Sequence, residues 1–191
     1  VIRDIPKHLA NEIIVVDNGS TDRTAEVALN AGARVVSEHR RGYGAACLKG
    51  IASANNPDII VFIDGDYSDY PEEMVKLIDP ILKGEADLVI GSRIAGSIAR
   101  NVIPPHAYWG NRLTAWLIHI LYRHHFTDVG PFRAISDNGL LKLAMNDTNY
   151  GWTVEMQVKA VIRGLKVIEI PVSYRKRIGK SKVTGTVAGS M

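Results

Sequence analysis

The sequence predicts an α/β fold, because short apolar runs alternate with helical segments through its first half. Strands are expected near 12–17, 33–37, 58–64 and 86–92. Helices are expected near 21–31, 43–55 and 71–83. The runs Glu12–Asp17 and Asp58–Asp64 are β-branched and end in carboxylates, which is typical of strands buried on both faces of a parallel sheet.

The helix expected at 71–83 has clear end signals. Pro71 followed by two glutamates favours a helix start, and Gly84 favours a stop. Pro80 is expected to kink or split this helix. At the start of the chain, residues 1–9 look like the back of an amphipathic helix with no strand before it.

The second half is built differently, since a connector containing Gly, Ser and Pro follows Arg93. A long helix is expected next, with one apolar stripe formed by Trp109, Leu113, Trp116, Leu117, Ile120 and Leu121. Such a stripe is more often core or subunit interface than membrane contact. A helix near 152–163 ends at Gly164, and a partly exposed strand is expected over 167–174.

Composition limits the classes of protein. The chain of 191 residues has 46% hydrophobic residues, enough for the core of one domain, or of one domain with an appended lobe. A single cysteine, Cys47, excludes an internal disulfide framework and favours a reducing, cytoplasmic setting. No apolar run approaches the roughly 20 residues that cross a bilayer, so membrane contact is expected to be peripheral or outside this chain.

Three carboxylates are expected to meet at one edge of the sheet. In open α/β sheets, ligands bind beyond the carboxyl ends of the strands, where Asp17, Asp64 and Asp66 lie. Carboxylate oxygens suit a hard divalent cation. An isolated Asp-Gly pair is more often a simple turn, but here two acidic turns occupy parallel positions. Asp17 is expected to accept hydrogen bonds from a base or ribose.

Two glycine-containing segments resemble phosphate-binding loops. The loop 41–44 opens a helix, so its amides either approach a phosphate or simply connect two elements. The segment 179–181 is not a P-loop, because Tyr174 stands where a glycine is required. The basic run 174–182, in a chain of net charge +3, suits phosphate or an anionic surface. Four histidines lack ligand spacing and are read as surface residues: His106, His119, His124 and His125.

Six segments together resemble a family 2 glycosyltransferase of the GT-A fold. They are EIIVVDNGSTDRT, RRGYGAA, DIIVFIDGDYSDYPEEM, DLVIGSR, FTDVGPFRAI and GWTVEMQVKAVIRGLKVIEIPVSYRKRIGKSK. Within that family the chain is most similar to the dolichyl-phosphate mannose or polyprenyl-phosphate sugar synthase branch, where TD…FRA, Val-Glu-Met and Gly-x-Ser-Lys recur in this order.

The resemblance implies a Rossmann-like, three-layer sandwich that lacks its first strand. It implies one catalytic domain over 1–191, in which 1–97 binds the nucleotide sugar and 98–191 binds the acceptor and carries a basic C-terminal loop. Asp64 and Asp66 would form the DxD motif that binds Mg²⁺ or Mn²⁺ against the diphosphate of the donor. The implied catalytic residues are Asp128, Arg133 and Glu155. The implied substrate-binding residues are Asp17, Gly42, Gly44, Arg93, Trp152, Arg177, Ser181 and Lys182.

Three departures from the family pattern matter. The first strand and its Pro-x-x-Asn-Glu element should precede Val1, which suggests a fragment. Ser68 stands where dolichyl-phosphate mannose synthases often have Gln, so an extra metal ligand is in question. Lys176 stands where the tail usually has Arg, with Arg175 and Arg177 on either side; which cation acts is therefore open.

The predicted reaction moves a sugar, with inversion, from a nucleotide-diphosphate donor to a polyprenyl phosphate at the membrane surface, and no nucleic acid is expected as a partner. A homo-oligomer is left open. One alternative is a family 2 enzyme with a glycan or small hydroxyl acceptor, for which Asp128 would be an obligatory base. Others are a receiver-like signalling domain, which the unlike second half argues against, and a noncatalytic nucleotide-binding remnant.

Overall fold

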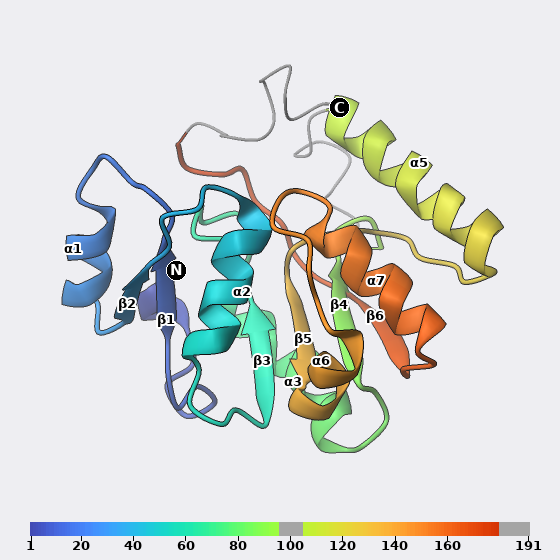
Figure 1. The fold of residues 1–191 in the computed structure, drawn as a ribbon, viewed down its shortest axis with the longest axis horizontal. Helices are drawn as coiled ribbons and strands as arrows, with labels where there is room; N and C mark the ends of the chain where they lie inside the picture. The colour runs from blue at the N-terminus through green and yellow to red at the C-terminus, as the bar shows by residue number, and fades with distance from the viewer. Residues whose placement is uncertain (96–104, 180–191) are drawn as a thin grey trace.

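The computed structural model describes residues 1–95 and 105–179 (Figure 1). Its strands are β1 (Ile14–Asp17), β2 (Arg34–Ser37), β3 (Ile59–Phe62), β4 (Leu88–Ser92), β5 (Arg133–Ser136) and β6 (Val167–Pro171). Its α-helices are α1 (Thr24–Asn30), α2 (Tyr43–Ser53), α3 (Met74–Leu82), α5 (Pro105–Tyr122), α6 (Asp137–Leu143) and α7 (Trp152–Ile162). Two 3₁₀ turns, η1 (Ile2–Asp4) and η2 (Pro71–Glu73), complete the order.

The described strands form two sheets. Strands β1 and β2 pair in parallel, and the second sheet has the order β3-β5-β4-β6. In that sheet β5 runs antiparallel to both of its neighbours, and β4 and β6 are parallel. The expectation of parallel pairing therefore holds for β1, whereas β3 pairs with an antiparallel strand. Strand β5 was not predicted, because its four residues begin with an arginine and contain no apolar run.

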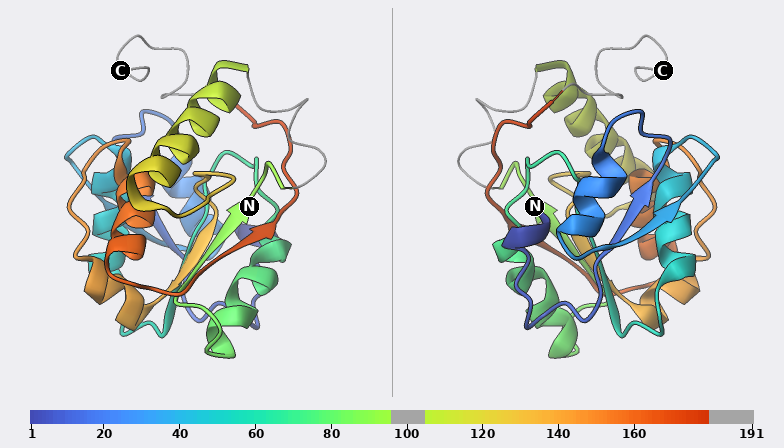
Figure 2. Two further views of the ribbon diagram at one scale, coloured as in Figure 1. Left: turned by 90° about the vertical axis from the view of Figure 1, so that its right-hand side faces the viewer. Right: turned by 90° about the vertical axis from the view of Figure 1, so that its left-hand side faces the viewer.

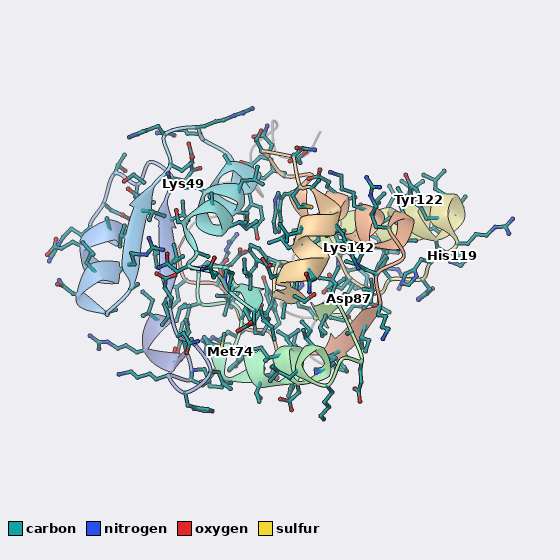
Figure 3. All side chains as sticks on the ribbon, turned by 60° about the horizontal axis from the view of Figure 1, so that its bottom comes forward. Lys49, Met74, Asp87, His119, Tyr122 and Lys142 are labelled. Carbon is teal, nitrogen blue, oxygen red and sulfur yellow. The ribbon has the colours of Figure 1, made fainter. Side chains whose placement is uncertain are left out.

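Helices cover both faces of the sheets. Figure 2 shows α3 on one face and α6 and α7 on the other, and in Figure 3 Lys49 of α2 and Lys142 of α6 lie across the sheet from Met74 of α3. Neighbouring residues of β4 enter different cores, since Leu88 packs with α6 and α7 while Val89 packs with α3. The predicted three-layer arrangement is confirmed.

Most helix boundaries match the expectation, with three corrections. Pro80 does not split α3, because it lies in the last turn, where Lys83 still donates to the Asp79 carbonyl at 3.1 Å. Gly84, with φ of +71°, ends that helix as predicted. The N-terminal segment forms only η1, since Ile5 precedes a proline and adopts an extended backbone. Helix α6, capped by the Ser136 hydroxyl, was not anticipated.

The apolar stripe of α5 is not core. Ala115 and Ile118 face the interior, whereas the six stripe residues are each at least 43% exposed. Figure 3 shows α5 projecting beyond the sheet, with His119 and Tyr122 near its outer end. None of the described helices combines the length and apolar character needed to cross a membrane.

Candidate active site

The polar residues of interest gather at one edge of the sheets, where β3 and β4 end and β5 begins. Arg133, the first residue of β5, lies opposite Phe62 of β3 and Ile90 of β4. Asp64 follows β3 by two residues, and Arg93 follows β4 directly. Figure 1 shows the loops beyond these strand ends on the upper side of the molecule.

In the acidic loop (residues 64–70), the carboxylate of Asp66 is held on both sides, by Ser68 of the loop and by Arg177. One carboxylate oxygen of Asp66 accepts the Ser68 amide at 2.9 Å and the Ser68 hydroxyl at 2.5 Å. The other oxygen is paired with the Arg177 guanidinium. Ser68 is only 1% exposed. Its hydroxyl therefore orients the Asp66 carboxylate.

Two further carboxyls lie near Asp66, the half-buried Asp64 and the buried Asp69. Burial, followed by the charge of Asp66, raises the pKa of Asp64 to about 6. Asp69 is 1% exposed, and among the described residues neither of its carboxylate oxygens has a hydrogen-bond partner. Burial and then the charge of Asp64 raise the pKa of Asp69 to about 7. Sequence reasoning gave Asp69 no role, because nothing in the run Asp66–Pro71 distinguishes it from a turn residue.

The C-terminal strap (residues 172–178) crosses the acidic loop. The Arg175 amide donates to the Ser68 carbonyl at 2.9 Å. The guanidinium of Arg175 lies 3.2 Å from the ring centre of Tyr67 and 4.2 Å from that of Tyr70, and its Nε donates to the Tyr67 carbonyl. Cation–π contact and hydrogen bonding together fix this part of the strap on the loop. Arg175, one of the cations whose role the sequence left open, therefore fixes the strap on the acidic loop.

Asp128 is completely buried and forms an ion pair with Arg93. Arg93 donates to Asp128 through its amide, Nε and Nη2, each at 2.8 Å, and Asn111 of α5 donates through its side-chain amide. Burial acts against the charge, but the bonds from Arg93 prevail and lower the pKa of Asp128. Gly130 leaves space for this pair, because an added Cβ would lie 3.1 Å from the Arg93 Nε. Both carboxylate oxygens of Asp128 are thus engaged, which makes it an anchor for Arg93.

The backbone of the Asp128 loop is held from β6 and α7. Glu169 accepts the amides of Thr127 at 2.8 Å and Asp128 at 3.1 Å. Gln157 donates to the Asp128 carbonyl at 2.9 Å. Sequence analysis missed both residues. The only signal was a charged Glu169 inside an otherwise apolar strand.

Arg133 lies beneath the site rather than on its surface. It is 0% exposed and donates to the carbonyls of Thr153, at 3.0 Å, and Gly130. No partner for its Nε occurs among the described residues. Burial lowers the pKa of Arg133 to about 10. It can contribute positive charge to the floor of the site, but direct contact with an acceptor would require it to become exposed.

The glycines that begin α2 serve a close backbone contact. The amide of Gly44 donates to the Asn149 carbonyl at 3.0 Å, and that of Gly42 to the Asn18 side chain at 2.9 Å. An added Cβ at Gly44 would lie 2.2 Å from the Asp147 carbonyl oxygen, and one at Gly42 would lie 2.1 Å from the Thr148 oxygen. These amides are engaged within the protein, so the close contact with residues 147–149 already accounts for glycine at both positions.

Two other predicted residues also have structural contacts. Glu155 accepts the amides of Asn146 at 2.9 Å and Asp147 at 2.8 Å and pairs with Lys159. Trp152 is 0% exposed in the core, with its ring centre 4.8 Å from that of Phe62. Ser181 and Lys182 fall outside the described residues.

Asp17 lies at the end of β1, where one of its oxygens accepts the Ser20 amide at 2.9 Å. The neighbouring Asn18 donates to the carbonyls of Glu38 and Arg40, at 2.9 and 2.7 Å, and so joins two loops. Asn18 was not singled out from the sequence. Its hydrogen bonds therefore support the loop that carries Asp17.

The acidic loop fits a divalent cation that is shared with a ligand. Within the described ranges, no group of three or more His, Cys, Asp or Glu side chains could hold an ion by itself. Asp64 and Asp66 provide carboxylate oxygens, and Mg²⁺ commonly binds one or two carboxylates together with water and substrate phosphates. Arg177 already places one positive charge against Asp66. The charge and donor type therefore suit a cation bound with a diphosphate.

Known proteins with similar sequences were identified by comparison with this chain. Residues 1–143 match the model of glycosyl transferase family 2. An uncharacterized glycosyltransferase of Mycobacterium tuberculosis is 39% identical over 183 residues, covering 93% of this chain and 80% of the relative. The polyprenol monophosphomannose synthase of Mycolicibacterium smegmatis is 32% identical over 195 residues, covering 91% of this chain and 71% of the relative.

A solved structure has a similar fold. Glucosyl-3-phosphoglycerate synthase from Mycobacterium tuberculosis, in complex with Mn²⁺, uridine diphosphate and glucosyl-3-phosphoglycerate, matches with a TM-score of 0.71 and 27% identity. The match covers 95% of this chain and 66% of that chain. The present chain thus spans just under two thirds of that enzyme.

Proposed function

Because the chain belongs to glycosyl transferase family 2, we propose that it moves a sugar from a nucleotide-diphosphate donor to a polyprenyl phosphate, with a divalent cation and with inversion. Its GT-A fold and its place among the glycosyltransferases exclude a receiver-like domain. The observation that carries the proposal is the charge pattern of the site. Asp66 forms an ion pair with Arg177, and the positive charges of Arg93 and Arg177 favour the ionised form of the neighbouring Asp64.

The donor is proposed to lie across the acidic loop. A cation bound by Asp64 and Asp66 would stabilise the negative charge that develops on the leaving diphosphate. Arg177 and Arg93 would bind the diphosphate oxygens through charge-assisted hydrogen bonds. Asp17, at the end of β1, would accept a hydrogen bond from the base or ribose.

The acceptor is proposed to be a lipid phosphate. Two relatives, the polyprenol monophosphomannose synthase and a dolichyl-phosphate hexose transferase, have names that specify such acceptors. Helix α5 exposes its apolar stripe beside the site, because Asn111 on the same helix bonds Asp128. The segment 105–126 carries Arg112 and Arg123 and no acidic residue, which suits peripheral contact with an anionic membrane.

A small hydroxyl acceptor is the second candidate. The similar solved enzyme contains glucosyl-3-phosphoglycerate, which is a sugar on a small phosphorylated acid. A hydroxyl acceptor requires a base, and Asp128 is the carboxylate nearest to the Arg93 side of the site. Its engagement by Arg93 and Asn111 makes the lipid phosphate, whose oxygen is already ionised near neutral pH, the better candidate.

A transfer assay tests both candidates. The chain is incubated with a panel of radiolabelled nucleotide sugars and Mn²⁺, and either a short polyprenyl phosphate in detergent or 3-phosphoglycerate is supplied. Label in the polyprenyl product, lost with EDTA and in Asp64→Asn, is expected. Transfer only to 3-phosphoglycerate would overturn the lipid acceptor, and transfer to neither would favour the noncatalytic remnant.

A further inference from the structure

Arg177 holds the carboxylate that a divalent cation would need. Its guanidinium contacts one oxygen of Asp66, while Ser68 donates two hydrogen bonds to the other oxygen. The Asp66 side chain is 16% exposed, so this pair is shielded from solvent more than an ordinary surface pair. A cation that bound Asp66 through the Arg177 side would have to displace the guanidinium.

The C-terminal strap does not depend on Arg177 for its position. The Ile178 amide donates to the Asp66 carbonyl at 2.8 Å. Asp69 and Tyr174 form an antiparallel bridge, and Arg175 is fixed between two tyrosine rings. Arg177 can therefore release Asp66 while the backbone on either side of it stays on the acidic loop.

The two arginines whose charges act on Asp64, Arg93 and Arg177, differ in how firmly their side chains are held. Arg93 is bound at Asp128 by three hydrogen bonds, and its side chain is 15% exposed. Among the described residues, the Arg177 guanidinium forms an ion pair with Asp66 alone, and the Arg177 side chain is 37% exposed. Of these two cations, Arg177 is the one with room to change partner.

We propose that Arg177 competes with the divalent cation for Asp66, and that cation binding transfers its guanidinium from Asp66 to the diphosphate of the donor. The proposal rests on the proposed function for the identity of the diphosphate. A dication on Asp66 repels the guanidinium, and the diphosphate beside it attracts the guanidinium. Arg177 thus neutralises the acidic loop before the cation binds and positions the donor afterwards.

The test measures Mn²⁺ and nucleotide binding separately. Free Mn²⁺ is followed by electron paramagnetic resonance for wild type, Arg177→Gln, Arg177→Lys and Lys176→Gln. Lys176 is the matched control, because it carries the same charge one residue away and is exposed. UDP and GDP are then titrated by calorimetry at saturating Mn²⁺. A thermal melt of each variant confirms folding.

Opposite shifts are expected for the two ligands in Arg177→Gln. Without nucleotide, Mn²⁺ should bind roughly 5- to 10-fold tighter, as expected for loss of a competing, partly shielded ion pair. At saturating Mn²⁺, the nucleoside diphosphate should bind about 10-fold weaker. Arg177→Lys should largely restore both constants, and Lys176→Gln should change each by less than about twofold.

Other outcomes overturn the inference. Weaker Mn²⁺ binding in Arg177→Gln than in wild type would mean that Arg177 only supports the loop. Equal Mn²⁺ affinities of wild type and Arg177→Gln, or no Mn²⁺ binding by either, would exclude competition. If wild type binds Mn²⁺ but neither nucleotide, the proposed function fails and the Mn²⁺ titration still decides the competition at Asp66.

Discussion

The buried pair of Arg93 and Asp128 offers the sharpest test of how the site is held. Asp128 is 0% exposed, and the side chains share two hydrogen bonds of 2.8 Å. Removing one member of such a pair leaves the other charge buried, which typically costs about 3–5 kcal/mol. We therefore expect Asp128→Asn and Arg93→Met each to lower the free energy of unfolding by about 3 kcal/mol. In a chain of this size, that corresponds to about 6–12 °C in melting temperature.

A double-mutant cycle in urea measures the pair itself. The double variant should be more stable than the sum of the single losses predicts, with a coupling energy of about 2–3 kcal/mol. The folded-state pKa of Asp128 lies below its unfolded value. Its contribution is therefore complete above the unfolded pKa and is lost as pH falls through the folded pKa, so wild type and Asp128→Asn should converge in stability at acid pH. A coupling below about 0.5 kcal/mol would refute this account of the site.

The same variants separate anchoring from base catalysis. If Asp128 acts by holding Arg93, both single variants should lose transfer to a similar extent when assayed well below their melting temperatures. Retained transfer in Arg93→Met, together with complete loss in Asp128→Asn, would identify Asp128 as a base and favour a hydroxyl acceptor.

Three further predictions concern other parts of the chain. Gly44→Ala should destabilise the fold by more than about 2 kcal/mol in urea denaturation, because its Cβ meets a backbone oxygen at 2.2 Å, whereas Gly65→Ala, with no atom within 4 Å, is the control and should be tolerated. Mn²⁺ binding should weaken as pH falls below about 6, where Asp64 protonates, and in paramagnetic resonance titrations Asp64→Asn should bind Mn²⁺ weakly at every pH; a wild-type affinity that does not change between about pH 7 and pH 5 would exclude Asp64 as a ligand. Flotation with anionic liposomes should be lost on replacing Trp109 and Trp116 by Ser, since both side chains are more than half exposed, and a wild-type chain that ignores liposomes would contradict membrane contact.

The sequence predicted the elements whose signals are local. The apolar runs that became β1, β3 and β4 and the glycine stop at Gly84 all follow from periodicity and backbone preference. Asp64 and Asp66 were proposed as metal ligands on a similar local signal, since carboxylates that follow an apolar strand can be recognised in the sequence.

The features that were not predicted from the sequence depend on contacts between distant parts of the chain. The short strand β5 is stabilised by its two neighbours and carries no pattern of its own. The close approach of Gly42 and Gly44 to residues 147–149, about 100 positions later, also carries no local signal, and their binding of phosphate stays a prediction. The stripe of α5 was expected to be core or subunit interface, and only the core is excluded, because amphipathicity says which face is apolar and not what covers it. Supporting residues such as Glu169 and Asn111 act through partners that no spacing reveals.

The place of β5 in the sheet has a consequence for how the chain reaches its native state. Strands β3 and β4 belong to the first half of the sequence, and β5, from the second half, lies between them. A nascent chain that ends before Arg133 would expose two facing strand edges, each a template for pairing with another chain. Its central ladder can form only by closing loops of about 70 and 40 residues, a non-local step that slows folding. The two halves of the sequence are therefore expected to fold as one cooperative unit, and expression of either half alone should yield aggregated protein.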